Sequence, residues 1–124
     1  MDEIIRQEAE KARPFIEAAL EYCGGTHTFA DVVGALVEGD MQLWATDKAA
    51  VVTELQMFPQ YRACNFFLAG GDMNELAHFQ RVIGEWAKAQ GCRRLTITGR
   101  RGWERTFLKD EGYTPKWTTF SKEL

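Results

Sequence analysis

The glycine pair Gly70-Gly71 is the part of this 124-residue sequence that could bind an anion. It follows an apolar stretch over residues 62–69 and precedes Asp72-Met73-Asn74-Glu75, where a D-x-x-E pattern predicts the capped start of a helix. Free backbone N–H groups and the positive end of the helix dipole meet at such a start, and both attract phosphate. A tight turn from strand to helix also uses glycine pairs without any ligand, and that structural role is the commoner one.

The cysteine and histidine residues are the other candidates for chemistry, but their spacing does not fit a metal site. Cys23, Cys64 and Cys92 are far apart, no C-x-x-C pair occurs, and only His27 and His78 could assist them. We therefore expect no metal ion and three free thiols in a reducing compartment. Cys64 is predicted to be a small core residue of a strand rather than a nucleophile.

The composition is that of one soluble globular domain over residues 1–124, with 45% hydrophobic and 27% charged residues. A chain of this length buries enough surface to fold without a metal or a disulfide. No apolar run approaches the roughly 18 residues that span a bilayer, and the first five residues are acidic rather than basic and apolar. We expect an intracellular, cytoplasmic protein with no membrane partner.

Charge is distributed unevenly along the chain. Residues 1–91 hold seven Lys and Arg against fourteen Asp and Glu, whereas residues 92–124 hold eight against four. The basic residues of the second part could meet a phosphate, a nucleic acid or a cofactor pyrophosphate, or could simply form a solvated face; they are Arg93, Arg94, Arg100, Arg101, Arg105, Lys109, Lys116 and Lys122. With a net charge of −3 and no nucleic-acid-binding motif, a nucleic-acid partner is not expected.

Hydrophobic periodicity predicts an α+β fold. Helical spacing predicts helices over residues 3–22 and 28–39, and alternation predicts strands over 41–46, 50–58 and 62–69. A helix over 72–90, a strand over 92–98, a short helix over 102–111 and a final strand over 114–124 follow. The crossover from 62–69 to 92–98 should make these two strands parallel neighbours in an otherwise antiparallel sheet with helices on both faces.

The aromatic residues of these elements are expected to pack in the core rather than bind a cofactor. Trp86 and Trp103 lie on the apolar faces of their helices, as does Phe107. Trp44 and Trp117 fit half-buried strand positions.

The order of elements and several short motifs resemble the GNAT superfamily of N-acetyltransferases over about residues 3–122. The resemblance is carried by residues 66–71 (Phe-Phe-Leu-Ala-Gly-Gly), by Gly91-Cys92 between helix and strand, by the strand Arg94-Leu95-Thr96-Ile97, and by the ending Lys109-Asp110-Glu111-Gly112-Tyr113. The layout is also similar to small GNAT-like proteins encoded by tailed phages. In that case the protein would act in the host cytoplasm or in the virion.

The resemblance implies an acetyl-CoA-dependent enzyme that transfers its acyl group directly to a primary amine of a small molecule or a protein. In the family, the cofactor lies at the divergence of the two parallel strands, which is the expected cleft. The implied cofactor-binding residues are Leu68 and the turn residues Gly70, Gly71, Asp72, Met73 and Asn74. A backbone amide of the strand near Leu68 would polarise the acyl carbonyl. The family commonly uses a strand Glu as general base, for which Glu54 is the candidate here.

Two departures from the family pattern favour a second hypothesis. The family's R/Q-x-x-G-x-G/A turn is replaced by Ala69-Gly70-Gly71-Asp72-Met73-Asn74, and Leu108 occupies the position of a tyrosine that serves as general acid in many members. Tyr61 or Tyr113 would have to supply that hydroxyl. The alternative is a GNAT-like scaffold without acyl transfer, a binding or virion-associated accessory protein with a protein partner. A second copy of the chain is a further candidate partner.

Overall fold

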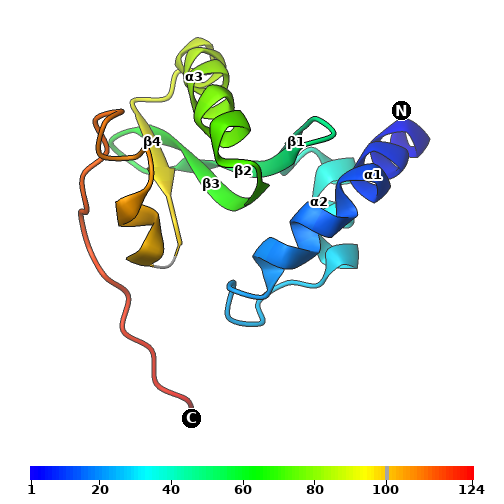
Figure 1. Ribbon diagram of the computed structural model, residues 1–124, viewed down its shortest axis with the longest axis horizontal. Coiled ribbons are helices and arrows are strands. Elements are labelled where there is room, and N and C mark those ends of the chain that lie inside the picture. The colour runs from blue at the N-terminus through cyan, green and yellow to red at the C-terminus, as the bar shows by residue number, and fades with distance from the viewer. Residues whose placement is uncertain (100) are drawn as a thin grey trace.

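The computed structural model describes residues 1–99 and 101–124, with Arg101 described for its backbone alone, and it places one four-stranded sheet between helices (Figure 1). In chain order the elements are α1 (Asp2–Leu20), α2 (Phe29–Glu38), β1 (Met41–Ala45), β2 (Ala49–Met57), β3 (Arg62–Gly71), α3 (Met73–Ala89), β4 (Arg94–Ile97) and the 3₁₀ helix η1 (Arg101–Arg105). The α+β class predicted from the sequence is confirmed.

The sheet has the strand order β1-β2-β3-β4. The pairs β1–β2 and β2–β3 are antiparallel, whereas β3 and β4 are parallel, with registers that run from Ala63↔Arg94 to Phe66↔Ile97. α3 connects these two parallel strands, as the sequence predicted. A bulge between Val52 and Thr53 leaves Phe67 as the extra residue of β3.

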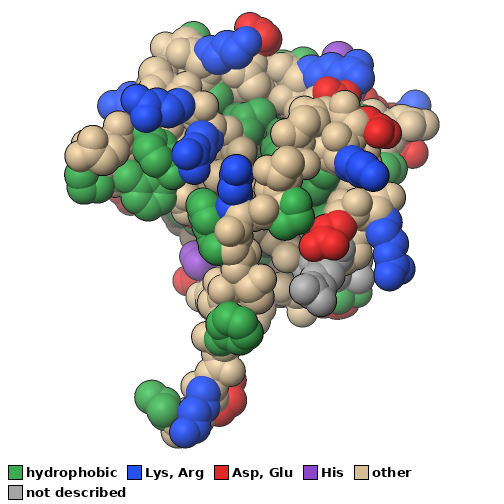
Figure 2. All heavy atoms as spheres, turned by 90° about the vertical axis from the view of Figure 1, so that its left-hand side faces the viewer, with side chains coloured by type: hydrophobic (Ala, Val, Ile, Leu, Met, Phe, Trp, Pro, Cys, Tyr) green, Lys and Arg blue, Asp and Glu red, His purple; other side chains and the backbone are tan. Residues whose placement is uncertain are grey.

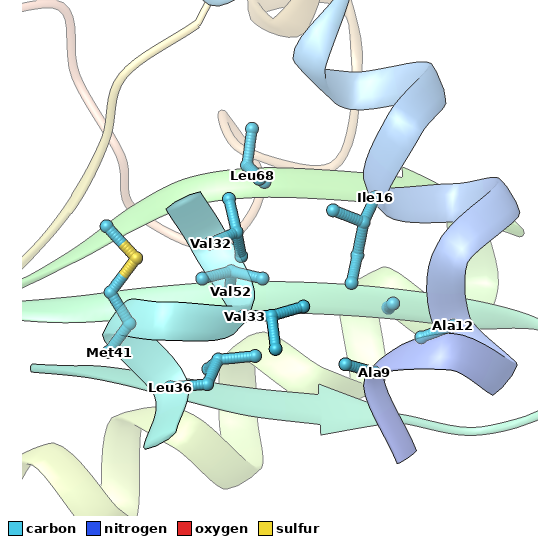
Figure 3. Close-up of a cluster of buried hydrophobic side chains, with 10 residues drawn as sticks. Ala9, Ala12, Ile16, Val32, Val33, Leu36, Met41, Val52 and Leu68 are labelled. Atoms are coloured by element: carbon cyan, nitrogen blue, oxygen red, sulfur yellow. The ribbon is translucent and has the colours of Figure 1, made fainter. Parts of the chain in front are cut away.

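One face of the sheet is covered by α1 and α2. Thr28 caps α2 in a complete capping box with Asp31, and Gly39 ends the helix in a left-handed conformation. The buried side chains of both helices meet the sheet in one cluster, shown in Figure 3, which includes Ile16, Val32, Leu36, Val52 and Leu68. This layer is the larger of the two halves of the core.

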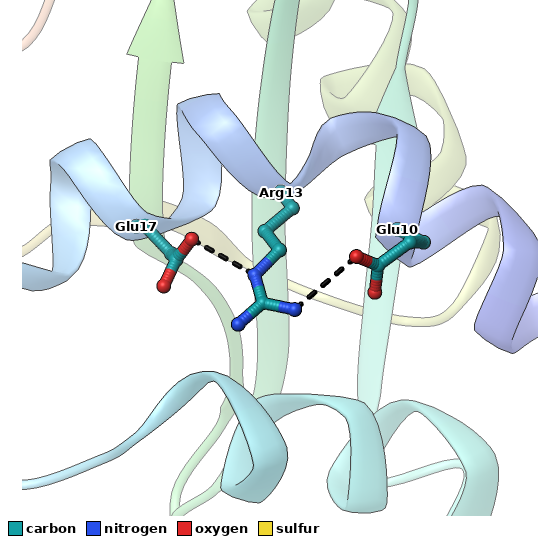
Figure 4. A network of polar contacts seen from close by, with 3 residues as sticks. All are labelled: Glu10, Arg13 and Glu17. Carbon is teal, nitrogen blue, oxygen red and sulfur yellow. Dashed lines mark hydrogen bonds and ion pairs between the residues drawn. The ribbon is translucent and has the colours of Figure 1, made fainter.

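Arg13 forms ion pairs within α1 and contacts Phe29 of α2. Its guanidinium contacts Glu17 at 2.9 Å and Glu10 at 3.2 Å (Figure 4), and it stacks over the Phe29 ring 4.5 Å from the centroid. Exposed ion pairs of this kind contribute little free energy, so the packing of the arginine stem and plane over Phe29 is the more useful contact. In the described part of the chain, none of the helices, α1 included, combines the length and apolarity that crossing a bilayer requires.

The other face of the sheet carries α3. Its buried residues Leu76, Phe79 and Ile83 pack on Val51, Cys64 and Phe66 of the strands. Trp86 and Phe107, expected in the core, are only half-buried and pack at its margin. Trp86 meets Trp44 edge-on with ring centroids 5.3 Å apart, so one face of each indole stays near solvent.

The C-terminal part differs most from the sequence-based expectation. The helix expected over 102–111 is a short 3₁₀ helix followed by turns. Residues 114–124 form no strand: they are exposed, and they extend away from the sheet and helices in Figure 1. Trp117, expected to be half-buried, is 70% exposed. Alternation creates a face suitable for a sheet, but a strand exists only when its backbone has a hydrogen-bonding partner.

Candidate functional site

Gly70 and Gly71, expected to form a turn after a strand over 62–69, are the last two residues of β3 and pair with Ala50 and Ala49 of β2. Packing on either side of the strand requires both glycines. A Cβ at Gly70 would lie 2.6 Å from the carbonyl oxygen of Phe15 in α1. Gly71 has φ = 111°, and a Cβ there would collide with the Lys48 carbonyl and lie 2.6 Å from the Ala49 Cα. Both glycines therefore allow close approach of the protein's own backbone, so the structural role considered from the sequence applies to each.

The amide groups at the start of α3 are only partly used by the protein itself. The Asp72 N–H donates to the Lys48 carbonyl at 2.9 Å, and the Glu75 N–H donates to Asp72 Oδ2 at 3.0 Å. The N–H groups of Met73 and Asn74 have no acceptor within the described residues. Both residues are exposed, which leaves two adjacent donors at the positive end of a 17-residue helix.

Asp72 and Glu75 form half of the predicted capping box. The Asp72 carboxylate caps the helix, but the Asp72 N–H bonds to Lys48 rather than to the Glu75 side chain. Two carboxylates nevertheless remain within one turn of the free amides. Their negative charge opposes a diphosphate at this point, whereas the helix dipole and the two N–H groups favour it.

The two parallel strands diverge close to this turn. Their pairing ends at Phe66↔Ile97, with one further contact from the Thr98 N–H to the Phe66 carbonyl at 3.4 Å. From Leu68 to Gly71, β3 pairs with β2 alone. Leu68 itself points into the core beneath α1 and α2 and is 4% exposed, so only its backbone could face a ligand at the divergence.

The space opened by the divergence is filled on the α3 side. Trp103 and Phe107, with ring centroids 6.4 Å apart, pack edge-to-face beside Phe66, Ala69, Leu76 and Ile97. The cavity that remains there is about 10 Å³, roughly the space of one water molecule. The open cleft expected on this side of the sheet is therefore absent from the described part of the structure, because η1 and the following turn occupy it.

Glu54 lies in a polar network that crosses three strands. Its Oε1 accepts from the amide groups of Asn65 at 3.1 Å and Gln56 at 3.2 Å. The Asn65 Oδ1 in turn accepts from the hydroxyls of Thr96 at 2.8 Å and Thr98 at 3.1 Å. Strand alternation places the network on the face that carries α1 and α2. Both bonds to Glu54 reach Oε1, so within the described chain Oε2 remains free to accept a proton.

Asn65, Thr96 and Thr98 are residues of this network that sequence reasoning missed, and His27 was considered from the sequence only as a metal ligand. His27, in the connection between α1 and α2, lies over Phe67 with ring centroids 4.6 Å apart, two residues along β3 from Asn65. The signal for Asn65 was present: it is a polar residue inside an otherwise apolar strand. Its register opposite Glu54 and beside Thr96 was decided only by the folded sheet.

None of the tyrosines considered as a general acid approaches the turn. Leu108 is half-buried and has no hydroxyl. Tyr113 donates its hydroxyl to Gln80 Oε1 at 3.0 Å, and burial, followed by the charges of Glu111 and Cys64, raises its pKa to about 12. Tyr61 precedes β3, so about 30 Å of strand separates it from Gly71.

Cys64 behaves as a structural thiol. Burial raises the pKa of Cys64 to about 11, with a further contribution from Cys92, so this thiol is protonated and unreactive at neutral pH. Within residues 1–99 and 102–124, no three His, Cys, Asp or Glu side chains gather in a way that could hold a metal ion.

In the part of the chain that the structure describes, basic residues of the C-terminal part lie in separate places. Arg93 and Arg94 lie over the Tyr61 ring at 5.8 and 4.7 Å, far along the sheet from the turn. Lys116 and Lys122 belong to the exposed C-terminal segment. Figure 2 shows Lys and Arg side chains spread over this face of the molecule. The side chains of Arg100 and Arg101 lie outside the described residues.

Several solved structures with the same architecture are named as acetyltransferases or as a possible acetyltransferase. The ribosomal-protein-alanine N-acetyltransferase of Brucella melitensis biovar Abortus 2308 matches with a TM-score of 0.68 at 11% identity, over 95% of this chain and 94% of its own. A possible acetyltransferase of Clostridium difficile 630 matches with a TM-score of 0.67 at 10% identity, over 100% and 93%.

An acetyltransferase of Trypanosoma brucei matches with a TM-score of 0.56 at 9% identity, over 90% of this chain and 94% of its own. No protein-family model and no curated protein matches the sequence. At these identities the likeness concerns the fold, and the chain has the fold of the GNAT acetyltransferases.

Proposed function

We propose that the protein is an acetyl-CoA-dependent N-acyltransferase that transfers its acyl group directly to a primary amine. One observation carries this proposal: β3 loses its β4 partner beyond Phe66 at the same end of the sheet where α3 presents the free N–H groups of Met73 and Asn74. A strand with an unpaired backbone beside two amide donors suits an extended ligand that ends in a phosphate group. The GNAT fold supports the same reading.

The residues present fit the cofactor in part. The Met73 and Asn74 amides would hold the pyrophosphate, and the β3 backbone near Leu68 would hold the acyl end. Trp103 and Phe107 fill the α3 side of the divergence, so binding there requires these rings to move. Acetyl-CoA supplies an acyl group already activated as a thioester, which is the chemistry that the amino-acid side chains lack.

Glu54 is the proposed general base. Asn65 lies five residues before Gly70, and Glu54 is opposite Asn65, so the carboxylate is roughly 17 Å along the strand from the turn. As the amine nitrogen bonds to the acyl carbon and the carbon–sulfur bond breaks, Glu54 Oε2 would take the amine proton through water, because Asn65, its partner on β3, lies about 10 Å along the strand from Leu68. A thiol has a pKa near 8.5, so the sulfur can leave as a thiolate without a tyrosine acid. Most of the rate would come from holding the two reactants together.

The acceptor is proposed to be a primary amine of a small molecule or a protein. The Brucella neighbour is named for transfer to an alanine of a ribosomal protein, which keeps protein amino groups among the candidates for this chain. His27 and the Glu54 network lie on the same face of the sheet, where an amine would find both a ring and a carboxylate.

A non-catalytic role is the second candidate, and specific observations favour it. The rings of Trp103 and Phe107 fill the cofactor side of the divergence, Asp72 caps the helix, and the Tyr113 hydroxyl is held by Gln80. A GNAT scaffold closed in this way would act as an accessory protein that binds a protein partner. It would be virion-associated if the chain is encoded by a phage or prophage.

Replacing Met73 by proline separates the two candidates. Asp72 has φ = −64° and ψ = 129°, which suits the residue before a proline, and proline is favoured at the first helical position. Met73→Pro therefore removes one free N–H while leaving the helix intact. Met73→Ala is the matched control, because it removes the same side chain and keeps the donor.

Calorimetric titration with coenzyme A and acetyl-CoA is the measurement. We expect binding by the wild type and by Met73→Ala, and an affinity roughly tenfold lower for Met73→Pro, as expected for one lost hydrogen bond to a charged group. Equal affinity of the two variants would place the pyrophosphate elsewhere. No binding by any of the three proteins would overturn the acyltransferase proposal and leave the accessory role.

A further inference from the structure

Residues 114–124 are here called the tail. Among the described residues, neither the outer edge of β4 nor the tail is paired with a strand, and each could pair with the other. β4 is the last strand of the sheet, and within the described residues its backbone is hydrogen-bonded to β3 alone. A bare edge strand exposes a row of N–H and C=O groups that can pair with another strand.

A groove runs beside this edge, between α3 and β4. It has a volume of about 130 Å³ and is lined by the small residues Gly84 and Ala87, by Cys92 and Leu95, and by the basic residues Lys88, Arg93 and Arg94. Gly84 is close to β4, since a Cβ there would lie 3.4 Å from Leu95 Cδ1. A strand added to β4 would cover this groove, and a large apolar side chain from that strand would fill it.

The tail has the sequence of a strand without the structure of one. Trp117, Thr119 and Ser121 alternate with Lys116, Thr118 and Phe120. In the structure the tail forms no secondary structure, and it projects from the body of the molecule in Figures 1 and 2. Trp117 is 70% exposed and Phe120 is 93% exposed, although these are the tail side chains that gain most from burial.

The base of the tail is anchored where it can reach another molecule. Tyr113, immediately before the tail, is held on α3 by the hydrogen bond from its hydroxyl to Gln80. Its N–H donates to the Leu108 carbonyl at 2.9 Å, in the turn that follows η1. From this point the eleven residues of the tail span at most about 36–40 Å when extended. The tail leaves its own sheet edge bare and extends beyond the domain.

We propose that two copies of the chain exchange their tails. Each tail adds one strand to the β4 edge of the other copy and places Trp117 in the groove over Gly84 and Ala87. Reciprocal exchange satisfies both bare edges and buries the Trp117 ring of each copy, whereas Phe120 lies on the opposite face of the added strand. The result is a closed twofold dimer that cannot grow into a fibre. The occupant of the groove is therefore a second copy of this chain.

Light scattering after size exclusion, on the full chain at a series of concentrations, tests the exchange. The wild type is expected to have twice the mass of one chain. The double variant Trp117→Lys/Phe120→Lys is expected to have the mass of one chain, because the lysine at position 117 would have to enter a groove that is already lined by Lys88, Arg93 and Arg94. Both changed residues are exposed in the single chain, so folding is preserved. Ile4→Lys, at a 59% exposed position on α1, is the matched control and should remain dimeric.

Hydrogen exchange distinguishes the remaining outcomes. In the wild type, the amides of β4 and of the tail should be protected, and the double variant should lose this protection. A monomer with protected β4 amides would show that the tail pairs with its own sheet, which overturns the exchange. A dimer that persists in the double variant would show a different interface and also overturns it. None of these readouts depends on coenzyme A, so the result is independent of the proposed acyl transfer.

Discussion

Asn65 in β3 donates its side-chain amide to the Glu54 carboxylate in β2 at a distance of 3.1 Å, and its own carbonyl accepts the hydroxyls of Thr96 in β4 and of Thr98 just after it. Asn65 is 3% exposed, so this one side chain satisfies polar groups of three strands in a place that water reaches poorly. The bond engages Oε1 of Glu54, and within the described residues Oε2 accepts no hydrogen bond.

Asn65→Leu should destabilise the fold by about 1–3 kcal/mol, because it leaves the hydroxyls of Thr96 and Thr98 without their acceptor and leaves Glu54 with Gln56 as its remaining donor. Urea unfolding gives the measurement. Gln56→Leu is the control: Gln56 donates to the same Glu54 oxygen from a less buried position, and its loss should be smaller. Equal losses for the two variants would mean that Asn65 does not organise the network.

Asp72→Ala should lower stability by on the order of 1 kcal/mol, since the carboxylate caps α3 through the Glu75 N–H. Glu75→Gln should leave stability nearly unchanged, because the Glu75 side chain makes no return bond to Asp72 within the described structure. Thermal unfolding of both variants checks this. A loss for Glu75→Gln as large as that for Asp72→Ala would indicate a complete capping box.

Gly70→Ala should be destabilising by about 1–3 kcal/mol, because the added methyl group meets the Phe15 carbonyl and pushes α1 from the sheet. Gly34→Ala in α2 is the matched control. Nothing lies within 4 Å of a Cβ at Gly34, so alanine there should stabilise the helix by roughly 0.5–1 kcal/mol. The two changes in unfolding midpoint should therefore have opposite signs.

Alkylation of the native protein should modify Cys23 before Cys64. For Cys23, burial acts to raise the pKa, but hydrogen bonds from the His27 and Gly25 backbone and from Thr26 outweigh it and lower the pKa below the ordinary value. Cys64 has a pKa of about 11 and no exposed surface. Mass spectrometry after a short treatment with iodoacetamide at pH 8 distinguishes the sites. Faster modification of Cys64 would contradict its placement in the core.

The contribution of Glu111 to stability should disappear in acid. Its hydrogen bond to Arg81 lowers the pKa of the carboxyl, so the pairing stabilises the fold above the unfolded-state pKa and is lost as the pH falls through the lower folded value. The stability difference between the wild type and Arg81→Gln should therefore be larger at pH 7 than at pH 3. Denaturant titrations at the two pH values provide the comparison, and a difference that grows in acid would contradict the pairing.

The sequence by itself determined the elements from α1 to β4 and the parallel step of the sheet. Thr28 and Asp72 are helix caps whose function is local, and the apolar run of β3 followed by a helix and a short strand permits only a right-handed crossover. Each of these features depends on residues close together in the chain, so spacing and residue type were sufficient to predict them.

Only the tertiary structure decided how distant residues meet. Asn65, Glu54 and Thr96 come from three strands, and their contact depends on register, which residue spacing does not determine. Trp103 and Phe107 were expected in the core, but whether they leave room at the strand divergence depends on the path of η1. The alternation of residues 114–124 predicted a strand, yet the tail remains unpaired because a strand's hydrogen bonds come from a partner that the sequence pattern cannot supply.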